Sequence, residues 1–177
     1  MRSFFVYGYG ISVEEAEQKR AISFIQNHMH TLMKVLPPKT TNESIEAIGK
    51  LTPEYMDRLA KDDDDIMEIL RNKDEDLFDS VMSIMGHDDD TPFNAIMSTV
   101  TEIISSETGV HFGYEQGQPD ECIGGASIMM YQSYPWEMNA TEKGLTKELL
   151  HEELAPYAEE LGLDDRCIGE LEVEYFG

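Results

Sequence analysis

The segment Phe4-Phe5-Val6-Tyr7-Gly8-Tyr9-Gly10-Ile11 decides the fold. Its aromatic and β-branched side chains occupy both alternating faces, which is typical of a strand buried on both sides of a sheet. The pattern returns at residues 126–134, around Ser127-Ile128-Met129-Met130-Tyr131. We therefore expect these two segments to be the central strands of one sheet.

Two further segments alternate apolar with polar residues, as a strand does when one of its faces is wet. In residues 110–115 the apolar positions are Val110, Phe112 and Tyr114. In residues 170–175 Leu171, Val173 and Tyr175 alternate with Glu170, Glu172 and Glu174. Both segments are expected at the edges of the sheet.

The remaining sequence predicts helices. Apolar residues at helical spacing between residues 13 and 35 indicate one long helix, which Pro37-Pro38 ends. Residues 39–109 read as a run of short helices, in which Thr52-Pro53 and Thr91-Pro92 each combine an N-cap with proline at the first helical position. A last helix is expected from Thr141 to Leu161, kinked at Pro156.

The predicted order is strand, helices, strand, strand, helix, strand. This order is that of a ferredoxin-like (split βαβ) α+β fold, a four-stranded antiparallel sheet with the first and third strands in the centre. Residues 1–38 and 109–177 would form the sheet domain. Residues 39–108 would form an acidic helical insertion between the first helix and the second strand. An α+β sandwich with another strand order is the alternative.

The charge of the chain is strongly negative and unevenly distributed. The 177 residues include 36 acidic and 13 basic ones, a net charge of −23. Residues 1–50 carry 6 basic and 5 acidic groups, a net charge of +1, whereas residues 51–121 carry 4 and 19, a net charge of −15. Such a surface repels nucleic acid and anionic membranes and attracts basic proteins. We therefore expect a cytoplasmic protein that binds neither membrane nor nucleic acid directly.

Two aspartate runs, Asp62–Asp65 and Asp88–Asp90, invite comparison with calcium sites. An EF-hand loop that started at the first residue of either run would need glycine at its sixth position. Met67 and Phe93 stand there instead. These runs are expected to be solvated turns or partner-binding patches, with a weak divalent-cation site as the minor alternative.

Other catalytic and cofactor signatures are missing from the sequence. There is no phosphate loop, no dinucleotide fingerprint and no nucleophile elbow. The Glu148/His151 pair has the spacing of a di-iron ligand pair, but no second copy accompanies it. Cys122 and Cys167 are expected to be reduced thiols. We expect no cofactor, no resident metal and no enzymatic activity.

The leading hypothesis is an inhibitor that occupies the nucleic-acid-binding groove of a basic target by mimicking nucleic acid. The target would be a nucleic-acid-handling protein of the nuclease or CRISPR-effector class. Small size and acidity are also the character of phage and mobile-element anti-defence proteins, including anti-CRISPRs. The residues expected to contact the partner are all acidic: Asp62, Asp63, Asp64, Asp65, Glu68, Asp88, Asp89, Asp90, Glu170, Glu172 and Glu174.

Two alternatives use the same sequence differently. An immunity protein or antitoxin that neutralises a basic toxin needs the same acidity, and the sequence does not separate it from an inhibitor. A small-ligand-binding enzyme would use a pocket between sheet and insertion. Its expected lining is Tyr7, Tyr9, His111, Glu115 and Tyr131. The oligomeric state does not follow from the sequence.

Overall fold

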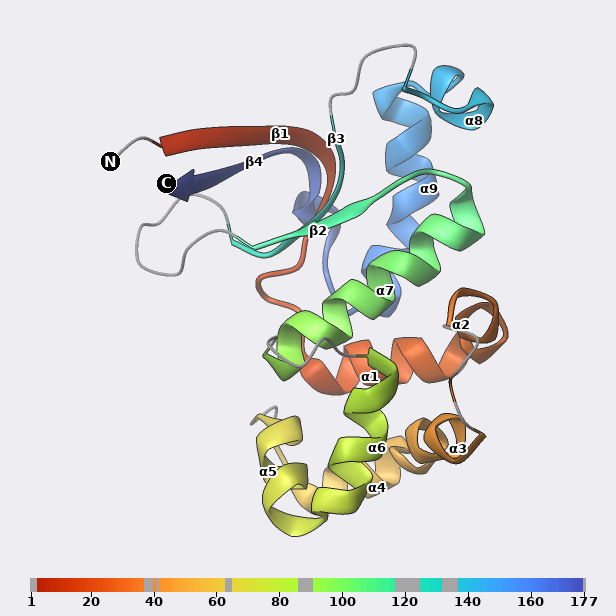
Figure 1. Ribbon diagram of the computed structural model, residues 1–177. Helices are drawn as coiled ribbons and strands as arrows, with labels where there is room; N and C mark the ends of the chain where they lie inside the picture. Colours follow the sequence, from red (N-terminus) through yellow and green to blue (C-terminus); the bar gives the residue numbers. More distant parts are fainter. Residues whose placement is uncertain are drawn as a thin grey trace. The chain divides into compact units, whose positions relative to one another are not determined.

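The computed structural model describes residues 3–36, 40, 42–62, 65–85, 91–116, 125–131 and 137–176, and they form a mixed α+β protein (Figure 1). The chain divides into two compact units. The sheet unit comprises Met1–Ala16 and Ile104–Gly177, and the helical unit comprises Glu17–Ile103. The domains predicted from the sequence place residues 17–38 with the sheet, whereas this division groups them with the helices.

The sheet is open, antiparallel and four-stranded, with the order β2-β3-β1-β4. The first and third strands therefore lie in its centre and the second and fourth at its edges, as their polarity predicted. Its strands are β1 (Ser3–Ser12), β2 (Gly113–Glu115), β3 (Ser127–Tyr131) and β4 (Ile168–Phe176). β2 is shorter than predicted, and β4 begins earlier.

Glycine at position 10 is required by the close approach of two strands. Gly10 lies opposite Met129 of β3 and Gly169 of β4. A Cβ atom on Gly10 would stand 1.8 Å from the carbonyl oxygen of Ile128, a backbone atom that the sheet holds in place. Any side chain here would therefore force β1 and β3 apart.

The C-terminal helical region of the sheet unit contains two helices where the sequence predicted one. α8 (Ala140–Lys143) starts with a capping box between Asn139 and Glu142. α9 (Lys147–Glu160) starts separately, because the Thr146 hydroxyl accepts a hydrogen bond from the backbone N–H of Leu149. Pro156 lies inside α9 without ending it. α9 packs against β1, β4 and the 3-10 helix η1 (Asp165–Cys167).

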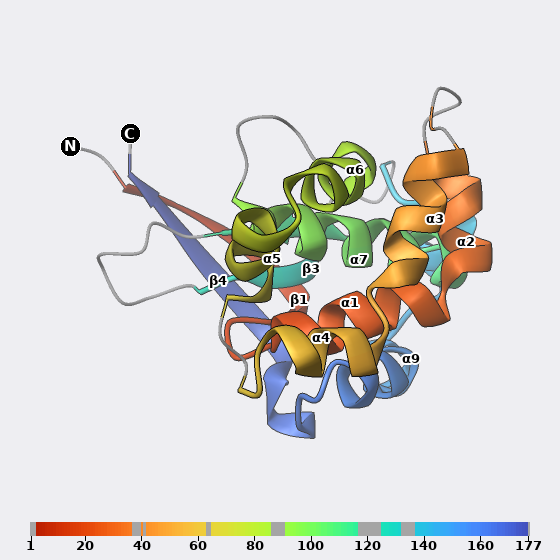
Figure 2. The ribbon, with the colours of Figure 1, turned by 90° about the horizontal axis from the view of Figure 1, so that it is seen from below.

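The helical unit contains short helices, as predicted for residues 39–109. In this unit α3 and α5 pack against α6, and α4 lies alongside α1 (Figure 2). The division between the units falls inside α7. The helices are α1 (Gln18–Asn27), α2 (Met29–Val35), α3 (Asn42–Lys50), α4 (Pro53–Leu59), α5 (Ile66–Lys73), α6 (Glu75–Met85) and α7 (Pro92–Thr108).

The single helix predicted over residues 13–35 is wrong. The helix begins only at Gln18, and it is interrupted at His28, whose φ of −108° and ψ of 26° are not helical. The His28 backbone N–H donates to the carbonyl oxygens of both Phe24 and Ile25. The His28 ring stacks on Phe24 at 4.2 Å between ring centroids.

The two predicted Thr-Pro helix starts are confirmed. The Thr52 hydroxyl accepts a hydrogen bond from the Tyr55 N–H at 3.2 Å, and Pro53 opens α4. The Thr91 hydroxyl accepts from the Asn94 N–H at 3.3 Å, and Pro92 opens α7. Because threonine caps a free N–H and proline has none to cap, this pair fixes where each helix begins.

Most methionines of the predicted helical insertion fill the core. Met56, Met67, Met85 and Met97 are buried, as expected for flexible side chains that fill gaps between helices. Among the helices of the described residues, none is both long and apolar enough to span a bilayer.

Candidate functional site

The strongest concentration of exposed acidic residues in the helical unit lies on α4, α5, α6 and their connections. We call residues 53–85 the acidic segment. Its sequence holds 11 acidic and 4 basic residues, a net charge of −7. Its described acidic residues are all exposed: Glu54, Asp57, Asp62, Asp65, Glu68, Asp74, Glu75, Asp76 and Asp79.

Several of these carboxylates also build the helices that carry them. Asp65 Oδ1 accepts a hydrogen bond from the Glu68 N–H at 3.1 Å and caps α5. Asp74 Oδ1 accepts from the Leu77 N–H at 3.0 Å at the start of α6. Negative charge at a helix N-terminus is favoured by the helix dipole. The local fold is therefore compatible with a high density of carboxylates.

The arginines of the acidic segment are directed at rings and at a carbonyl oxygen. The Arg58 guanidinium lies 5.8 Å from the centre of the Tyr55 ring, and its Nε donates to the Glu54 carbonyl oxygen at 3.3 Å. The Arg71 guanidinium lies 5.1 Å from the centre of the Phe78 ring. These contacts use the arginines without pairing them to a carboxylate.

Lys73 likewise contacts a backbone carbonyl oxygen. Lys73 Nζ donates to the Leu59 carbonyl oxygen at 3.3 Å. Among the described carboxylates of the acidic segment, Asp57 is the one that forms an ion pair, with Lys19 of α1 at 3.1 Å. The acidic segment therefore presents carboxylates to solvent that the described basic side chains leave largely uncompensated.

The residues predicted to contact a partner come from both units. Asp62, Asp65 and Glu68 lie exposed around the start of α5. Glu170 and Glu172 are exposed on β4, and Glu174 lies opposite Phe5 in the same strand pair. Asp63, Asp64, Asp88, Asp89 and Asp90 lie outside the described residues.

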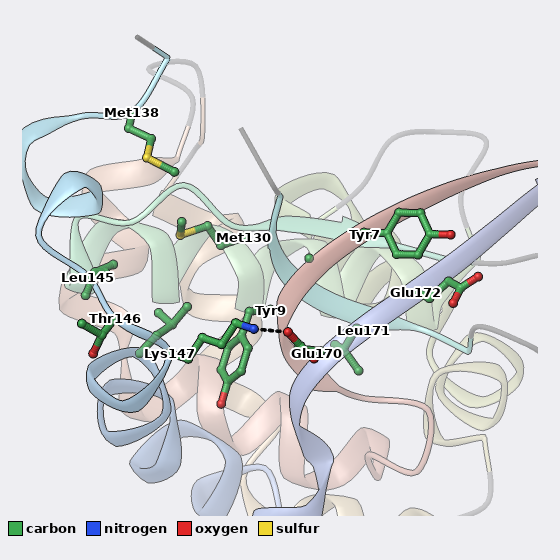
Figure 3. A pocket seen from close by; sticks show the side chains of 12 residues that line it. Tyr7, Tyr9, Met130, Met138, Leu145, Thr146, Lys147, Glu170, Leu171 and Glu172 are labelled. Atoms are coloured by element: carbon green, nitrogen blue, oxygen red, sulfur yellow. Dashed lines mark hydrogen bonds and ion pairs between the residues drawn. The ribbon is translucent and has the colours of Figure 1, made fainter. Parts of the chain in front are cut away.

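The sheet unit carries a cleft of about 560 Å³ between the sheet and the start of α9 (Figure 3). Most of its lining is apolar or aromatic, with Lys147, Glu170 and Glu172 as its charged groups. It is lined by Tyr7, Gly8, Tyr9, Met130, Met138, Leu145, Thr146, Lys147, Leu150, Glu170, Leu171 and Glu172.

This cleft differs from the predicted ligand pocket. It contains Tyr7 and Tyr9, but His111 and Glu115 are not among its lining residues. The side chain of Tyr131 lies outside the described part of the chain. All lining residues belong to the sheet unit, so residues of the predicted insertion contribute nothing to it.

The first strand is not buried on both faces along its whole length, contrary to the prediction from its sequence. Tyr7 is 53% exposed and Tyr9 is half-buried, whereas Ile11 is fully buried. In Figure 3 the side chain of Lys147, the first residue of α9, extends over Tyr9, while Tyr7 lies farther along β1. The start of α9 therefore covers one tyrosine more than the other.

An ion pair between Lys147 and Glu170 lies beside Tyr9 in the cleft. The Lys147 ammonium donates to Glu170 Oε1, and this hydrogen bond and the charge of Glu170 raise the pKa of Lys147. The Tyr9 hydroxyl lies 3.2 Å from His151 Nδ1, and His151 Nε2 lies 2.6 Å from Asp165 Oδ1. Burial and then the charges of Glu148 and Asp165 raise the pKa of Tyr9, so it is a neutral phenol at neutral pH.

Glu142 is a buried carboxylate with a structural role. It is 6% exposed and accepts hydrogen bonds from the backbone N–H groups of His111 and Asn139, both at 2.8 Å. His111 Nδ1 is a further partner at 2.9 Å. Burial raises the pKa of Glu142, but the hydrogen bonds and the His111 charge outweigh it, so the pKa is lowered overall.

The described residues contain no group of three or more His, Cys, Asp or Glu side chains placed to hold a metal ion. Cys167 is half-buried and forms no disulfide, and Cys122 lies outside the described residues. Comparison of the chain with protein-family models, with curated proteins and with solved structures gave no match.

Sequence reasoning missed two features of these sites. The Asn139-x-x-Glu142 spacing is a capping-box signal that pointed to a separate short helix. The pairing of Lys147 with Glu170 had no sequence signal, because 23 residues separate the two and only the packing of α9 on β4 brings them together.

Proposed function

We propose that the protein is an acidic inhibitor that binds a basic, nucleic-acid-handling protein and occupies its nucleic-acid-binding groove. The main support for this proposal is the acidic segment. Its exposed carboxylates are left largely uncompensated by the described basic side chains. Carboxylates one helical turn apart are separated by about 5–6 Å, which is of the same order as the spacing of successive backbone phosphates.

Electrostatic attraction would make docking fast and selective. A concentrated negative field steers a cationic groove into encounter and repels nucleic acid. Affinity would then come from apolar contacts among the carboxylates. We place the protein among phage or mobile-element anti-defence proteins such as anti-CRISPRs. An immunity protein or antitoxin would use the same surface against a basic toxin, and the identity of the captured target separates the two.

For the fold we propose a ferredoxin-like sheet unit that carries the acidic helices as an insertion. The strand order β2-β3-β1-β4 and the packing of α9 on β1 and β4 support this proposal. In this arrangement the sheet would anchor the helices whose carboxylates meet the target.

The test is capture of a partner followed by competition with DNA. The full chain, immobilised, is exposed to a lysate of the cells in which it acts, at about 50 mM and about 500 mM NaCl, because screening weakens contacts between exposed charges. We expect a basic nucleic-acid-binding protein to be retained at low salt and released at high salt. Added duplex DNA should displace it, and labelled DNA should not bind the immobilised chain.

A matched pair of variants locates the contact. The triple variant Asp62→Asn/Asp65→Asn/Glu68→Gln removes three charges of the acidic segment, and asparagine at position 65 still caps a helix. The control Glu17→Gln/Glu43→Gln/Glu46→Gln removes three equally exposed charges from residues 1–50. Capture should fall for the first variant alone. A ternary complex of protein, target and DNA would contradict groove occupancy.

A further inference from the structure

The fourth strand forms one edge of the sheet. The order β2-β3-β1-β4 places β1 on one side of β4, and none of the described strands pairs with its other side. An edge strand presents every second backbone N–H and C=O group outward, and this row is a template for a further strand. The opposite edge is β2, which has three residues where β4 has nine. β4 is therefore the edge that is long enough to pair with an extended segment.

The backbone of β4 is suited to such pairing. Its sequence, residues 168–176, contains no proline, so no N–H group is missing along the edge. Its register against β1 runs without interruption from Ile168 opposite Ile11 to Phe176 opposite Ser3, so no bulge turns the edge away. What remains to control access to this edge is charge, because Glu170 and Glu172 are exposed.

These two glutamates act differently on the two kinds of strand that the edge would meet. Directly opposite side chains of antiparallel strands interact, so that like charges destabilise the pair and opposite charges stabilise it. A second copy of the chain paired about Leu171 would set Glu170 against Glu172, and one paired about Glu172 would set that residue against itself. A strand with lysine or arginine at these positions gains from the same contacts. The edge therefore disfavours self-association and favours a basic segment.

The two faces of β4 specify the rest of the incoming strand. Lys147 already binds Glu170, whereas Glu172 lies farther along β4 and forms no ion pair with any basic side chain that the structure describes (Figure 3). Leu171 and Val173 alternate with the glutamates and therefore belong to the other face, where Val173 is fully buried and Leu171 half-buried. A complementary strand has a cation opposite Glu172 and an apolar residue on either side of it.

We propose that β4 receives an extended segment of the partner protein as a fifth strand, with arginine or lysine opposite Glu172 and apolar residues opposite Leu171 and Val173. The basic character of this partner rests on the proposed function, to which the net charge of −23 also points. In strand addition the main-chain hydrogen bonds give affinity, and the alternate side chains give specificity. The acidic segment would bring the partner in, and the edge of the sheet would hold it.

The first test uses a peptide and does not depend on finding the partner. The ¹⁵N-labelled full chain is titrated with acetyl-Lys-Val-Arg-Val-Lys-amide, and amide hydrogen exchange is followed by ¹H–¹⁵N correlation spectra. Outer-edge amides exchange readily until a partner strand bonds them. We expect protection to rise at every second residue within 168–176. Protection elsewhere alone would overturn the proposal, and so would protection of β4 that rises with protein concentration without peptide, because a second copy would then occupy the edge.

Two kinds of control peptide separate strand pairing from general attraction to an acidic protein. Acetyl-Lys-Arg-Val-Val-Lys-amide has the same composition but spreads its cations over both faces, and it should bind about fivefold more weakly. N-methylation of both valines and N-methylation of the arginine and last lysine block opposite edges of the peptide. One of these isomers should lose more than about tenfold in affinity and the other should keep most of it. Equal affinities within either comparison would overturn the proposal.

Matched variants of the full chain test the assigned position of the cation. Glu172→Gln should weaken the alternating peptide about two- to fivefold, and Glu172→Lys, which places like charges opposite each other, about tenfold. Glu159→Gln and Glu159→Lys change an exposed charge on α9 in the same ways, and each should alter the affinity less than about twofold. Similar effects at the two positions would mean non-specific attraction and would overturn the proposal.

Failure of this inference and failure of the proposed function are distinguishable. If the peptide protects alternate amides of β4 and no basic protein is captured, strand addition stands and groove occupancy fails. If a basic protein is captured and the amides of β4 exchange as in the free chain, the edge is not part of the interface and this inference fails alone.

Discussion

Basic side chains make different contacts in the sheet unit and in the acidic segment. In the sheet unit, Lys147 binds Glu170, and Arg166 binds Asp164. In the acidic segment, Arg58 and Arg71 lie over aromatic rings. The net charge of a region therefore does not by itself show where carboxylates remain without a basic partner. The sheet unit neutralises part of its acidity through these ion pairs, whereas the acidic segment leaves most of its described carboxylates without a basic partner among the described residues.

The largest effect on stability is expected when alanine replaces a glycine in the centre of the sheet, and the comparison is the same replacement on the surface of a helix. Gly10→Ala would place a Cβ 1.8 Å from a backbone oxygen, so the variant should lose more than about 3 kcal/mol of stability or fail to fold. Gly49→Ala, in α3, meets no atom within 4 Å and should gain about 0.5–1 kcal/mol. Urea unfolding followed by circular dichroism measures both. A Gly10→Ala variant with the parent midpoint would refute the close approach of β1 and β3.

The second prediction concerns a carboxylate used for structure. Glu142→Gln cannot satisfy the donors that converge on this buried side chain, and it should cost about 1–3 kcal/mol in the free energy of unfolding. Glu159→Gln, an exposed glutamate on α9, should stay within about 0.5 kcal/mol of the parent. Equal urea midpoints for the two variants would show that the Glu142 hydrogen bonds contribute nothing.

The pH dependence of the same residue follows from its lowered pKa. Because the pKa of Glu142 in the folded protein lies below its ordinary value of 4.5, its contribution to stability is complete above about that pH. The contribution is lost as the pH falls further, through the pKa of the folded state. Between roughly pH 5 and pH 3, the parent should therefore lose more stability than Glu142→Gln. Parallel pH profiles of the two proteins in urea unfolding would contradict this assignment.

The sequence predicted the strand positions because burial and alternation are local patterns. It predicted the starts of α4 and α7 because threonine and proline act on the adjacent turn. It did not predict the break at His28, because the apolar spacing continues at helical intervals across it. It placed Glu170 and Glu172 at a contact surface from charge alone. Their cleft requires the register of β1 against β4 and the docking of α9, which no local pattern encodes.

A smaller effect tests whether the carboxylates of the acidic segment repel one another. Screening over a Debye length of about 8–10 Å should relieve this repulsion, so added NaCl should raise the melting temperature of the parent by a few degrees. The Asp62→Asn/Asp65→Asn/Glu68→Gln variant should gain less from salt than Glu17→Gln/Glu43→Gln/Glu46→Gln. Differential scanning calorimetry across about 20–300 mM NaCl is the measurement. A melting temperature that falls with salt would count against uncompensated carboxylates.

The most direct test of the central claim is the rate at which the captured partner associates with the chain. At about 50 mM NaCl, the Asp62→Asn/Asp65→Asn/Glu68→Gln variant should associate about three- to tenfold more slowly than the parent, with a flatter salt dependence and little change in dissociation. The Glu17→Gln/Glu43→Gln/Glu46→Gln control should associate within about twofold of the parent. If the two triple variants slow association equally, or neither does, the acidic segment is not the surface that meets the partner.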